Sequence, residues 1–320
     1  MRSPFSMTLD FSHFNSLFSL VRHFNSNDVC KTFLAEARWG EDVVCPYCGE
    51  HHCSRCKDGR FNCKKCDRKF NVTVGTIFEN SKIGLDKWFM GIYLVSSHKS
   101  GISSCQLARD IEVTQKSAWF MLNKIRSTFG QNDNVALVGN VEVDEAYVGG
   151  DNKWRHESKK IPGGQGGANK TPIFGMVCRE NGNVVALKVD DTKSKTILPL
   201  ISQFISGDDT IVYTDESSIY NNLYSSCGFP RKACNHSEGF FSDGNGVHTN
   251  NIENFWHHFK AMIKGIYRHI SVDYMQRYVD EECFRWNSRD WNEGERFKFV
   301  FGACIGRFTY EDVKLTKKVA

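Results

Sequence analysis

Two Cys-x-x-Cys pairs constrain the fold of this chain more than any other feature of its sequence. Cys45 pairs with Cys48 and Cys63 with Cys66, and 14 residues separate the two pairs. Two such pairs can place four thiolates tetrahedrally around Zn²⁺, each at about 2.3 Å. We therefore predict a zinc ribbon over residues 43–76, in which these four cysteines hold a structural Zn²⁺.

A third Cys-x-x-Cys pair, Cys53 with Cys56, lies in the loop between the other two. This pair can compete for the metal, or it can lie in the loop without binding the metal. The outer pairs are preferred as ligands because their spacing matches a ribbon with a hairpin between its knuckles. Basic side chains near the second knuckle are candidate contacts for DNA phosphates, although a merely solvated basic face is the alternative. These candidates are Lys64, Lys65, Arg68 and Lys69.

The cysteine content favours a metal over disulfides. The chain has 13 cysteines, an odd number, and no N-terminal segment combines a basic start, an apolar run and a small-residue cleavage site. No run approaches the roughly 18 apolar residues of a membrane helix. We expect a reducing compartment and no membrane: the cytoplasm or nucleoid of a prokaryote, or the nucleus of a eukaryote. The net charge of +4 does not by itself indicate nucleic-acid binding, so local patches must carry that inference.

The segment before the ribbon, residues 1–42, has helical periodicity. Leu9, Phe14, Phe18 and Val21 are spaced for one apolar helical face. The pattern predicts one or two short helices in this segment.

Residues 77–132 have the layout of a helix-turn-helix. Ser103 can cap a first helix, residues 111–113 can form the turn, and Thr114 can cap a second helix. The second helix would present polar and basic side chains to DNA, as a recognition helix does. Two amphipathic helices with a purely structural role are the alternative. The side chains expected on or near the exposed side of the second helix are Gln115, Lys116, Lys124 and Arg126.

A mixed α/β domain is expected over residues 138–292, followed by a C-terminal tail over 293–320. The predicted strands are 141–144, 173–177, 184–189 and 210–214. The predicted helices are 194–205, 250–267 and 274–287. The Gly-rich stretch 161–169 lacks the residue order of a phosphate-binding loop and is predicted to be a flexible surface loop.

Three acidic residues of this domain are candidate metal ligands. Asp144 and Asp215 each end a predicted strand, and Glu253 lies in a predicted helix. A lone aspartate at a strand end is usually only solvated, but an RNase H-like sheet brings two such aspartates beside a carboxylate from a helix. Three carboxylates can hold two divalent cations about 3.5–4 Å apart. Oxygen ligands of this kind prefer Mg²⁺ or Mn²⁺.

Two further side chains share a helical face with Glu253. Lys260 follows it by about two helical turns and can bind the phosphate backbone beside the metals. His257 follows it by four residues and can act as a proton relay, or have a structural or DNA-contacting role.

Each aspartate is followed by a glutamate, Glu145 or Glu216, and neighbours on a strand face opposite ways. Only one member of each doublet can therefore point to the site. We choose the first, Asp144 and Asp215, partly from the resemblance described next.

Short stretches between about residue 25 and residue 289 carry a family resemblance. They are 33–39, 45–49, 70–78, 86–88, 106–108, 118–119, 143–149, 213–216, 248–256, 260, 267–269 and 277–281. In their order and diversity they resemble the IS1595-type (ISXO2-like) transposases and the related eukaryotic Merlin group.

The resemblance implies a DDE-type recombinase fold, an N-terminal zinc-binding domain and transposition of an element with terminal inverted repeats. It points to Asp144 and Asp215 as the two catalytic aspartates. The third family position is Glu in some members and Asn in others. Glu253 is taken here because a charged ligand holds a hard cation better than an amide, but its asparagine neighbours remain an alternative: Asn250, Asn251 and Asn254.

The expected function is a DNA transposase that binds double-stranded DNA at its transposon ends and at a target. It would cleave the 3′ ends and join them to the target with Mg²⁺ or Mn²⁺, and joining two ends calls for a homo-oligomer on DNA. One alternative is a domesticated, catalytically inactive DNA-binding regulator. Another is a two-metal nuclease on the same fold.

Overall fold

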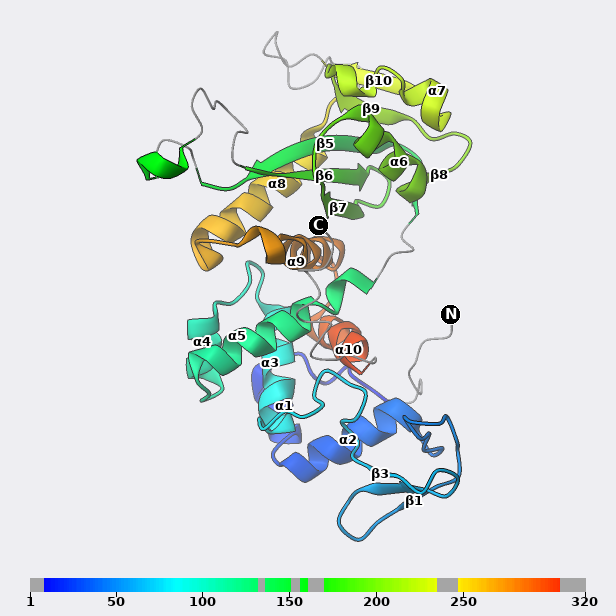
Figure 1. Ribbon diagram of the computed structural model, residues 1–320, viewed down its shortest axis with the longest axis vertical. Coiled ribbons are helices and arrows are strands. Elements are labelled where there is room, and N and C mark those ends of the chain that lie inside the picture. The colour runs from blue at the N-terminus through cyan, green and yellow to red at the C-terminus, as the bar shows by residue number, and fades with distance from the viewer. Residues whose placement is uncertain (1–8, 132–135, 151–155, 161–169, 235–246, 306–320) are drawn as a thin grey trace. The chain divides into compact units, whose positions relative to one another are not determined.

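The computed structural model describes residues 9–131, 136–150, 156–160, 170–234 and 247–305 (Figure 1). The chain divides into two compact units, and the second is inserted into the sequence of the first. The first unit is Met1–Gln131 with Asp290–Ala320, and the second is Asn132–Arg289. The predicted Gly-rich loop 161–169 lies outside the described residues.

The first unit is built from helices around an aromatic core. Its helices are α1 (Leu17–His23), α2 (Asn27–Trp39), α3 (Leu85–Ser97), α4 (Ser104–Asp110), α5 (Gln115–Arg126), η1 (Phe129–Gln131) and α10 (Glu293–Cys304). Helix α3 packs against α1, α2, α5 and α10. The core rings come from segments far apart in the sequence: Phe14, Phe24, Phe33, Phe89, Phe297 and Phe301.

The predicted apolar face of the first segment is wrong in part. Helix α1 begins at Leu17, with Ser16 as its N-cap, so Phe14 lies before the helix rather than on it. Phe14 is buried, whereas Phe18 is 73% exposed and Val21 is 42% exposed. The residue of α1 that is buried is Leu20, so the apolar face of this helix is not the predicted one.

The stretch after residue 293 differs from the expected tail. Glu293–Cys304 forms α10, whose N-cap Asn292 makes a capping box with Glu295. Phe297, Val300 and Phe301 of α10 are fully buried in the first unit. The Phe residues that pack inward lie four apart, which is the spacing of one helical face.

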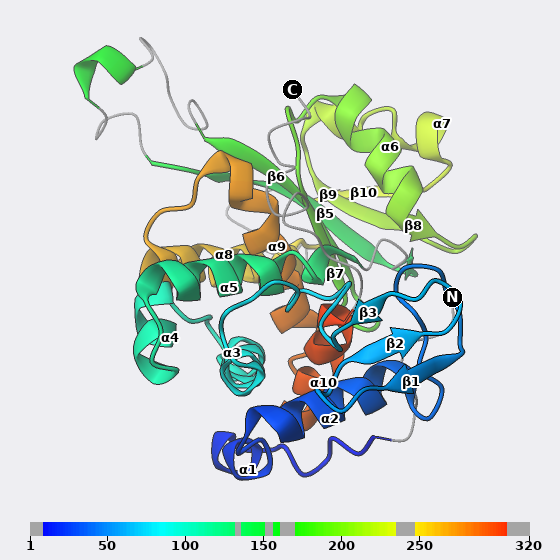
Figure 2. The same ribbon diagram turned by 60° about the horizontal axis from the view of Figure 1, so that its bottom comes forward.

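The ribbon of the first unit is a three-stranded antiparallel sheet of β1 (Cys53–Arg55), β2 (Phe61–Cys63) and β3 (Lys69–Phe70). The Phe61 and Phe70 rings stack with their centroids 5.7 Å apart. The Trp39 ring at the end of α2 packs edge-on at 5.1 Å from Phe61. Figure 2 shows the three strands next to α2, which supplies this small sheet with an apolar face to pack on.

The second unit contains a five-stranded mixed sheet with the strand order β10-β9-β5-β6-β7. Its strands are β5 (Val141–Val148), β6 (Thr171–Cys178), β7 (Val184–Lys188), β9 (Val212–Asp215) and β10 (Arg231–Cys234). Strands β5, β6 and β7 pair antiparallel, whereas β9 runs parallel to both β5 and β10. The short strands β4 (Leu137–Val138) and β8 (Ile205–Ser206) form a separate parallel pair.

Helices cover both faces of this sheet (Figure 1). One face carries α6 (Ser194–Phe204), η4 (Ser218–Tyr220) and α7 (Leu223–Cys227). The other carries α8 (Asn250–Met262), its π-helical continuation η6 (Ile263–Tyr267), η7 (Val272–Tyr274) and α9 (Met275–Asn287). A further short helix among the described residues is η3 (Glu157–Lys159).

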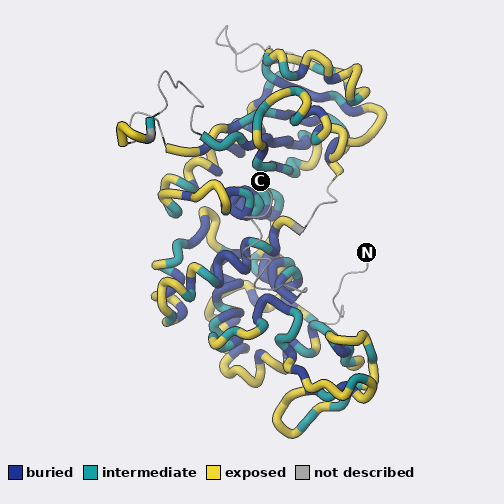
Figure 3. The backbone as a smooth tube through the Cα atoms, in the orientation of Figure 1, coloured by how far each residue is buried: buried dark blue, intermediate teal, exposed yellow. Residues whose placement is uncertain are grey.

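Alternation along β5 divides its side chains between the two faces. Val141 and Val143 join the core under α6, and Ala146 and Val148 join the core under α8. Figure 3 shows buried positions along the strands of this unit, as expected for a sheet covered on both sides. The prediction of a mixed α/β domain is confirmed. Within the described residues, no helix has the length and apolar character needed to cross a bilayer.

Candidate zinc centre and active site

The zinc centre is a group of four thiols whose sulfur atoms all lie within 4.8 Å of one another. The Sγ atoms of Cys45 and Cys66 are 3.7 Å apart, and those of Cys48 and Cys63 are 3.6 Å apart. Tetrahedral coordination with Zn–S bonds of about 2.3 Å requires S–S separations of about 3.8 Å. The donor set and its size therefore fit Zn²⁺.

Backbone turns position these thiols. Gly49 ends the first knuckle in the left-handed region (φ +73°), where a Cβ would be strained, and its N–H donates to the carbonyl of Cys45 at 3.0 Å. At the second knuckle, the backbone N–H of Cys66 lowers the pKa of the Cys63 thiol to about 6. Burial and the neighbouring thiols instead raise the pKa values of Cys48 and Cys66, so Cys63 ionises more easily than these two. The thiolate is the form that binds a metal ion.

The inner cysteine pair lies outside this group of thiols. Cys53 faces Cys63 across the β1–β2 ladder, and its Sγ donates to the Glu50 carbonyl at 3.5 Å. Burial, together with the neighbouring Cys63, raises the pKa of Cys53 to about 11. Neither Cys53 nor Cys56 belongs to the four-thiol set.

The acidic site lies in the second unit, where three elements meet. Asp144 lies on β5, Asp215 ends the adjacent parallel strand β9, and Glu253 lies in the first turn of α8. Burial raises the pKa of Asp144 to about 6, and the charges of Asp215 and Glu253 contribute to that rise. The structure thus brings the three predicted carboxylates into one electrostatic environment.

The carboxylates are more widely spaced than the thiols. Among the described residues, the four cysteines are the only set of three or more possible ligands whose donor atoms all lie within 4.8 Å of one another. Two cations about 3.5–4 Å apart can nevertheless be shared by carboxylates that do not all touch. The oxygen donors and the mutual repulsion felt by Asp144 fit divalent cations such as Mg²⁺.

The chain matches two families of known domains. Residues 136–287 match the ISXO2-like transposase domain, and residues 25–69 match the transposase zinc-ribbon domain. A protein of Halobacterium salinarum, named as an uncharacterized protein in transposable element ISH50, is 30% identical over 248 residues. That alignment covers 73% of this chain and 82% of the relative. The chain belongs to the ISXO2-like (IS1595) transposase family.

In this transposase-family chain, a glycine that the sequence analysis did not single out makes room for α8 beside Asp144. Gly175 of β6 is the register partner of Asp144. A Cβ at Gly175 would lie 2.5 Å from the Trp256 ring and 2.9 Å from Ile252 Cδ1. The missing side chain therefore lets α8 approach the sheet where the carboxylates meet.

The two members of the first acidic doublet lie on opposite faces of the transposase sheet. Glu145 accepts a hydrogen bond from the hydroxyl of Tyr220, which is buried in the core under α6. Burial raises the pKa of Glu145 to about 7. In the second doublet, Asp215 accepts a hydrogen bond from the Ser217 backbone at 3.0 Å, and Glu216 is exposed.

The other candidates on α8 separate into exposed and bonded side chains. Lys260 and His257 are exposed, as are Asn250 and Asn254. The Asn251 amide donates to Glu142 at 2.9 Å, whereas Glu253 accepts a hydrogen bond from the Thr249 hydroxyl at 2.9 Å. Among these side chains of α8, Glu253 is the one whose charge contributes to the raised pKa of Asp144.

The helices α4 and α5 of this transposase pack on each other and begin at the two caps that the sequence indicates. Ser103 and Thr114 accept from the backbones of Gln106 at 3.1 Å and Ser117 at 3.2 Å. The exposed candidates for DNA contact are Gln115 and Lys116 on α5, and Lys64, Lys65, Arg68 and Lys69 on the ribbon.

Two expected surface residues of α5 are buried instead, and this corrects the prediction. Lys124 is 5% exposed and Arg126 is 1% exposed. The ammonium of Lys124 donates to the carbonyl of Ile77 at 2.7 Å. The C-terminal half of α5 is turned into the first unit, so these cations bind protein groups rather than project outward.

Proposed function

We propose that this chain is a DNA transposase that binds terminal inverted repeats and catalyses metal-dependent 3′-end cleavage and strand transfer. Asp144, Asp215 and Glu253 are its catalytic carboxylates. One observation carries the proposal: Asp144 on the central strand β5 lies close enough to Asp215 of β9 and Glu253 of α8 that, beside burial, their charges raise its pKa.

The sheet topology supports an RNase H-like catalytic domain. An antiparallel meander of three strands leads through a helix to strands that extend the sheet in parallel on the other side of β5. Asp144 lies on the central strand and Asp215 on its parallel neighbour, while the third carboxylate comes from a helix packed on the same sheet. This arrangement suits a site at the sheet's surface that is open to a DNA strand.

The carboxylates would hold Mg²⁺ or Mn²⁺, which supply acidification of the attacking hydroxyl and stabilisation of the leaving oxygen. The Ser217 backbone orients Asp215, and the Thr249 hydroxyl orients Glu253. Lys260, exposed on the same helix as Glu253, would contact the phosphate backbone. In the two successive phosphoryl transfers, water attacks first, and the freed 3′-hydroxyl then attacks the target.

DNA binding is assigned to the first unit. The exposed ribbon lysines and Arg68 suit phosphate contacts, and α4–α5 act as a helix-turn-helix with Gln115 and Lys116 at the start of the recognition helix. Because two transposon ends must be joined, a homo-oligomer assembles on the DNA.

Cleavage and joining assays on labelled DNA from the element's own ends, with Mg²⁺, test this function. Wild type is compared with Asp144→Asn and Asp215→Asn, and Glu216→Gln is the matched control because its exposed carboxylate follows Asp215. The expected result is cleavage and joining by wild type and the control, with neither activity in the two aspartate variants. Cleavage without joining would indicate a nuclease. End binding without cleavage by wild type would indicate a DNA-binding regulator.

A further inference from the structure

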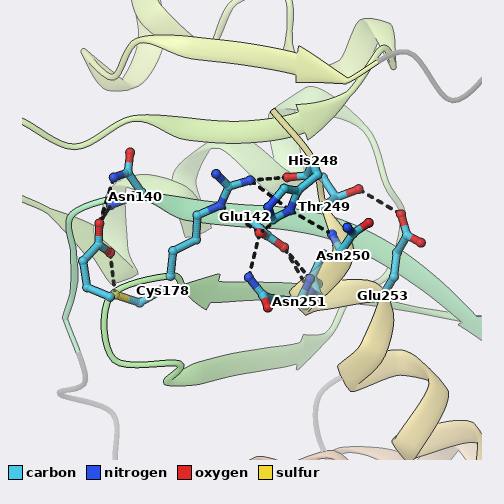
Figure 4. A network of polar contacts seen from close by, with 11 residues as sticks. Asn140, Glu142, Cys178, His248, Thr249, Asn250, Asn251 and Glu253 are labelled. Carbon is cyan, nitrogen blue, oxygen red and sulfur yellow. Dashed lines mark hydrogen bonds and ion pairs between the residues drawn. The ribbon is translucent and has the colours of Figure 1, made fainter. Parts of the chain in front are cut away.

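Glu142, two residues before Asp144 on β5, is a fully buried carboxylate. It accepts hydrogen bonds from the backbone N–H of Asn251 at 2.8 Å and of Ile252 at 3.1 Å, and from the Asn251 amide at 2.9 Å (Figure 4). Residues two apart on a strand share a face, so Glu142 and Asp144 both point towards α8.

These bonds make Glu142 the cap of helix α8. The first N–H groups of a helix have no partner within the helix, and the helix dipole favours a negative charge there. Thr249 occupies the N-cap but makes no side-chain cap, since its hydroxyl bonds to Glu253. A carboxylate from the sheet therefore accepts from the N–H groups of the first turn of α8, the turn that also carries Glu253.

Arg179 joins this cap to the third element of the site. Its Nε donates to Glu142 at 2.8 Å, and its Nη2 donates to the carbonyl of His248, just before α8. Its guanidinium lies over the Tyr213 ring, 3.6 Å from the centroid. Tyr213 is on β9, two residues before Asp215, so one arginine touches the segments that carry all three carboxylates.

We propose that Glu142 and Arg179 are positioning residues that hold α8 against β5 and β9, so that Glu253 reaches the cations shared with Asp144 and Asp215. This inference rests on the proposed function of those carboxylates. Neither residue touches the reacting atoms; both act through the placement of Glu253.

Glu142→Gln is the substitution that tests this proposal most directly. It keeps the side-chain volume but removes the charge facing Arg179 and turns one acceptor into a donor that faces backbone N–H groups. Asp144 and Asp215 stay on paired strands, so the main loss is the fixed position of Glu253. Outer-shell partners of metal ligands typically contribute 10–100-fold in metal affinity, so we expect a rise of about 10-fold in the Mg²⁺ concentration for half-maximal cleavage.

The experiment titrates Mg²⁺ in the cleavage assay with the full-length, zinc-loaded chain. The matched control is Glu180→Gln, which removes a neighbouring carboxylate that accepts from the Asn140 backbone at 2.8 Å. Asn251→Ala, at an exposed position, removes a single donor to Glu142 and should raise the half-maximal Mg²⁺ concentration by a smaller factor. If Glu142→Gln does not fold, Asn251→Ala decides the outcome.

Hydrogen exchange gives a second readout that does not depend on catalysis. The amides of Asn251 and Ile252 should exchange faster in Glu142→Gln than in wild type or Glu180→Gln. A lowered melting temperature with an unchanged Mg²⁺ dependence would mean a purely structural role and would overturn the proposal. Failure of the proposed function would look different, because Asp144→Asn would then cleave as wild type does.

Discussion

The zinc centre and the acidic site differ in how close together their ligands lie and in how far apart those ligands are in the sequence. The four thiols come from one short stretch and already lie within 4.8 Å of one another. The three carboxylates come from β5, β9 and α8 and lie further apart; burial, together with the charges of Asp215 and Glu253, raises the pKa of Asp144. A local motif builds the first site, whereas the second depends on strand pairing and on where α8 docks.

The largest effect is expected at the zinc centre. Cys45→Ser or Cys63→Ser should abolish stoichiometric zinc and unfold the ribbon, since zinc binding supplies on the order of 10 kcal/mol of folding free energy in small zinc domains. The second unit should stay folded because it has a core of its own. Zinc content and circular dichroism measure both effects. Cys56→Ser is the control. A zinc content equal to that of wild type in both Cys45→Ser and Cys63→Ser would show that these thiols do not hold the metal.

The docking of α8 can be tested at Gly175. Gly175→Ala places a Cβ 2.5 Å from the Trp256 ring, so α8 must shift. Overpacking of this kind destabilises by about 1–3 kcal/mol, and the shift should also lower cleavage by moving Glu253. Gly150→Ala is the control, since a Cβ there meets nothing within 4 Å. A melting temperature equal to that of the control would show that the acidic site does not depend on this close approach.

The raised pKa of Asp144, which is due first to burial and then to the neighbouring carboxylates, predicts a pH-dependent stability in the absence of divalent cations. The pKa of Asp144 is about 6 in the folded chain, above the ordinary value of 3.8 for an aspartate. The folded state therefore binds this proton more tightly, and the stability due to Asp144 falls as the pH rises from about 4 to about 6.

Asp144→Asn removes this loss of stability. At about pH 7.5 the metal-free variant should be more stable than wild type by about 1 kcal/mol, and near pH 4 the two should be equal. Thermal melts of zinc-loaded protein at both pH values measure the difference. A variant that is less stable than wild type at the higher pH would contradict a raised pKa of Asp144 in the folded chain.

The smallest effect is expected on the exposed face of the ribbon. Lys64→Ala should weaken binding about equally for all DNA sequences and reduce the slope of log affinity against log salt by about 1. Lys31→Ala, which removes a lysine paired with Asp28 on α2, is the control. An unchanged slope for Lys64→Ala would limit the ribbon to a structural role.

The difference between the two sites also explains which of their features could be predicted from the sequence. The spacing of the cysteines was enough to select four thiols, because knuckles and hairpin are local. The strands and helix bearing Asp144, Asp215 and Glu253 were also predicted, and the structure has β5, β9 and α8 there. The expected end of the first strand was wrong, because β5 continues to Val148 and Asp144 lies within it.

The remaining features depend on contacts between distant segments. Glu142 and Arg179 are far apart in the sequence, and the bond between them follows only from the pairing of β5 with β6. Lys124 was expected near the surface because its charge is typical of an exposed position, but packing buries it against Ile77.

Helix α10 was not predicted although local signals for it are present, namely the capping box of Asn292 with Glu295 and the spacing of Phe297 and Phe301. Only its packing against α3 depends on a distant segment.

Mn²⁺ binding to the zinc-loaded chain, followed by calorimetry, tests the central claim most directly. We expect wild type and the Glu216→Gln control to bind Mn²⁺. We expect Asp144→Asn, Asp215→Asn and Glu253→Gln each to lose most of that binding while keeping zinc. Wild-type Mn²⁺ affinity in any of these three variants would contradict a cation site shared by β5, β9 and α8.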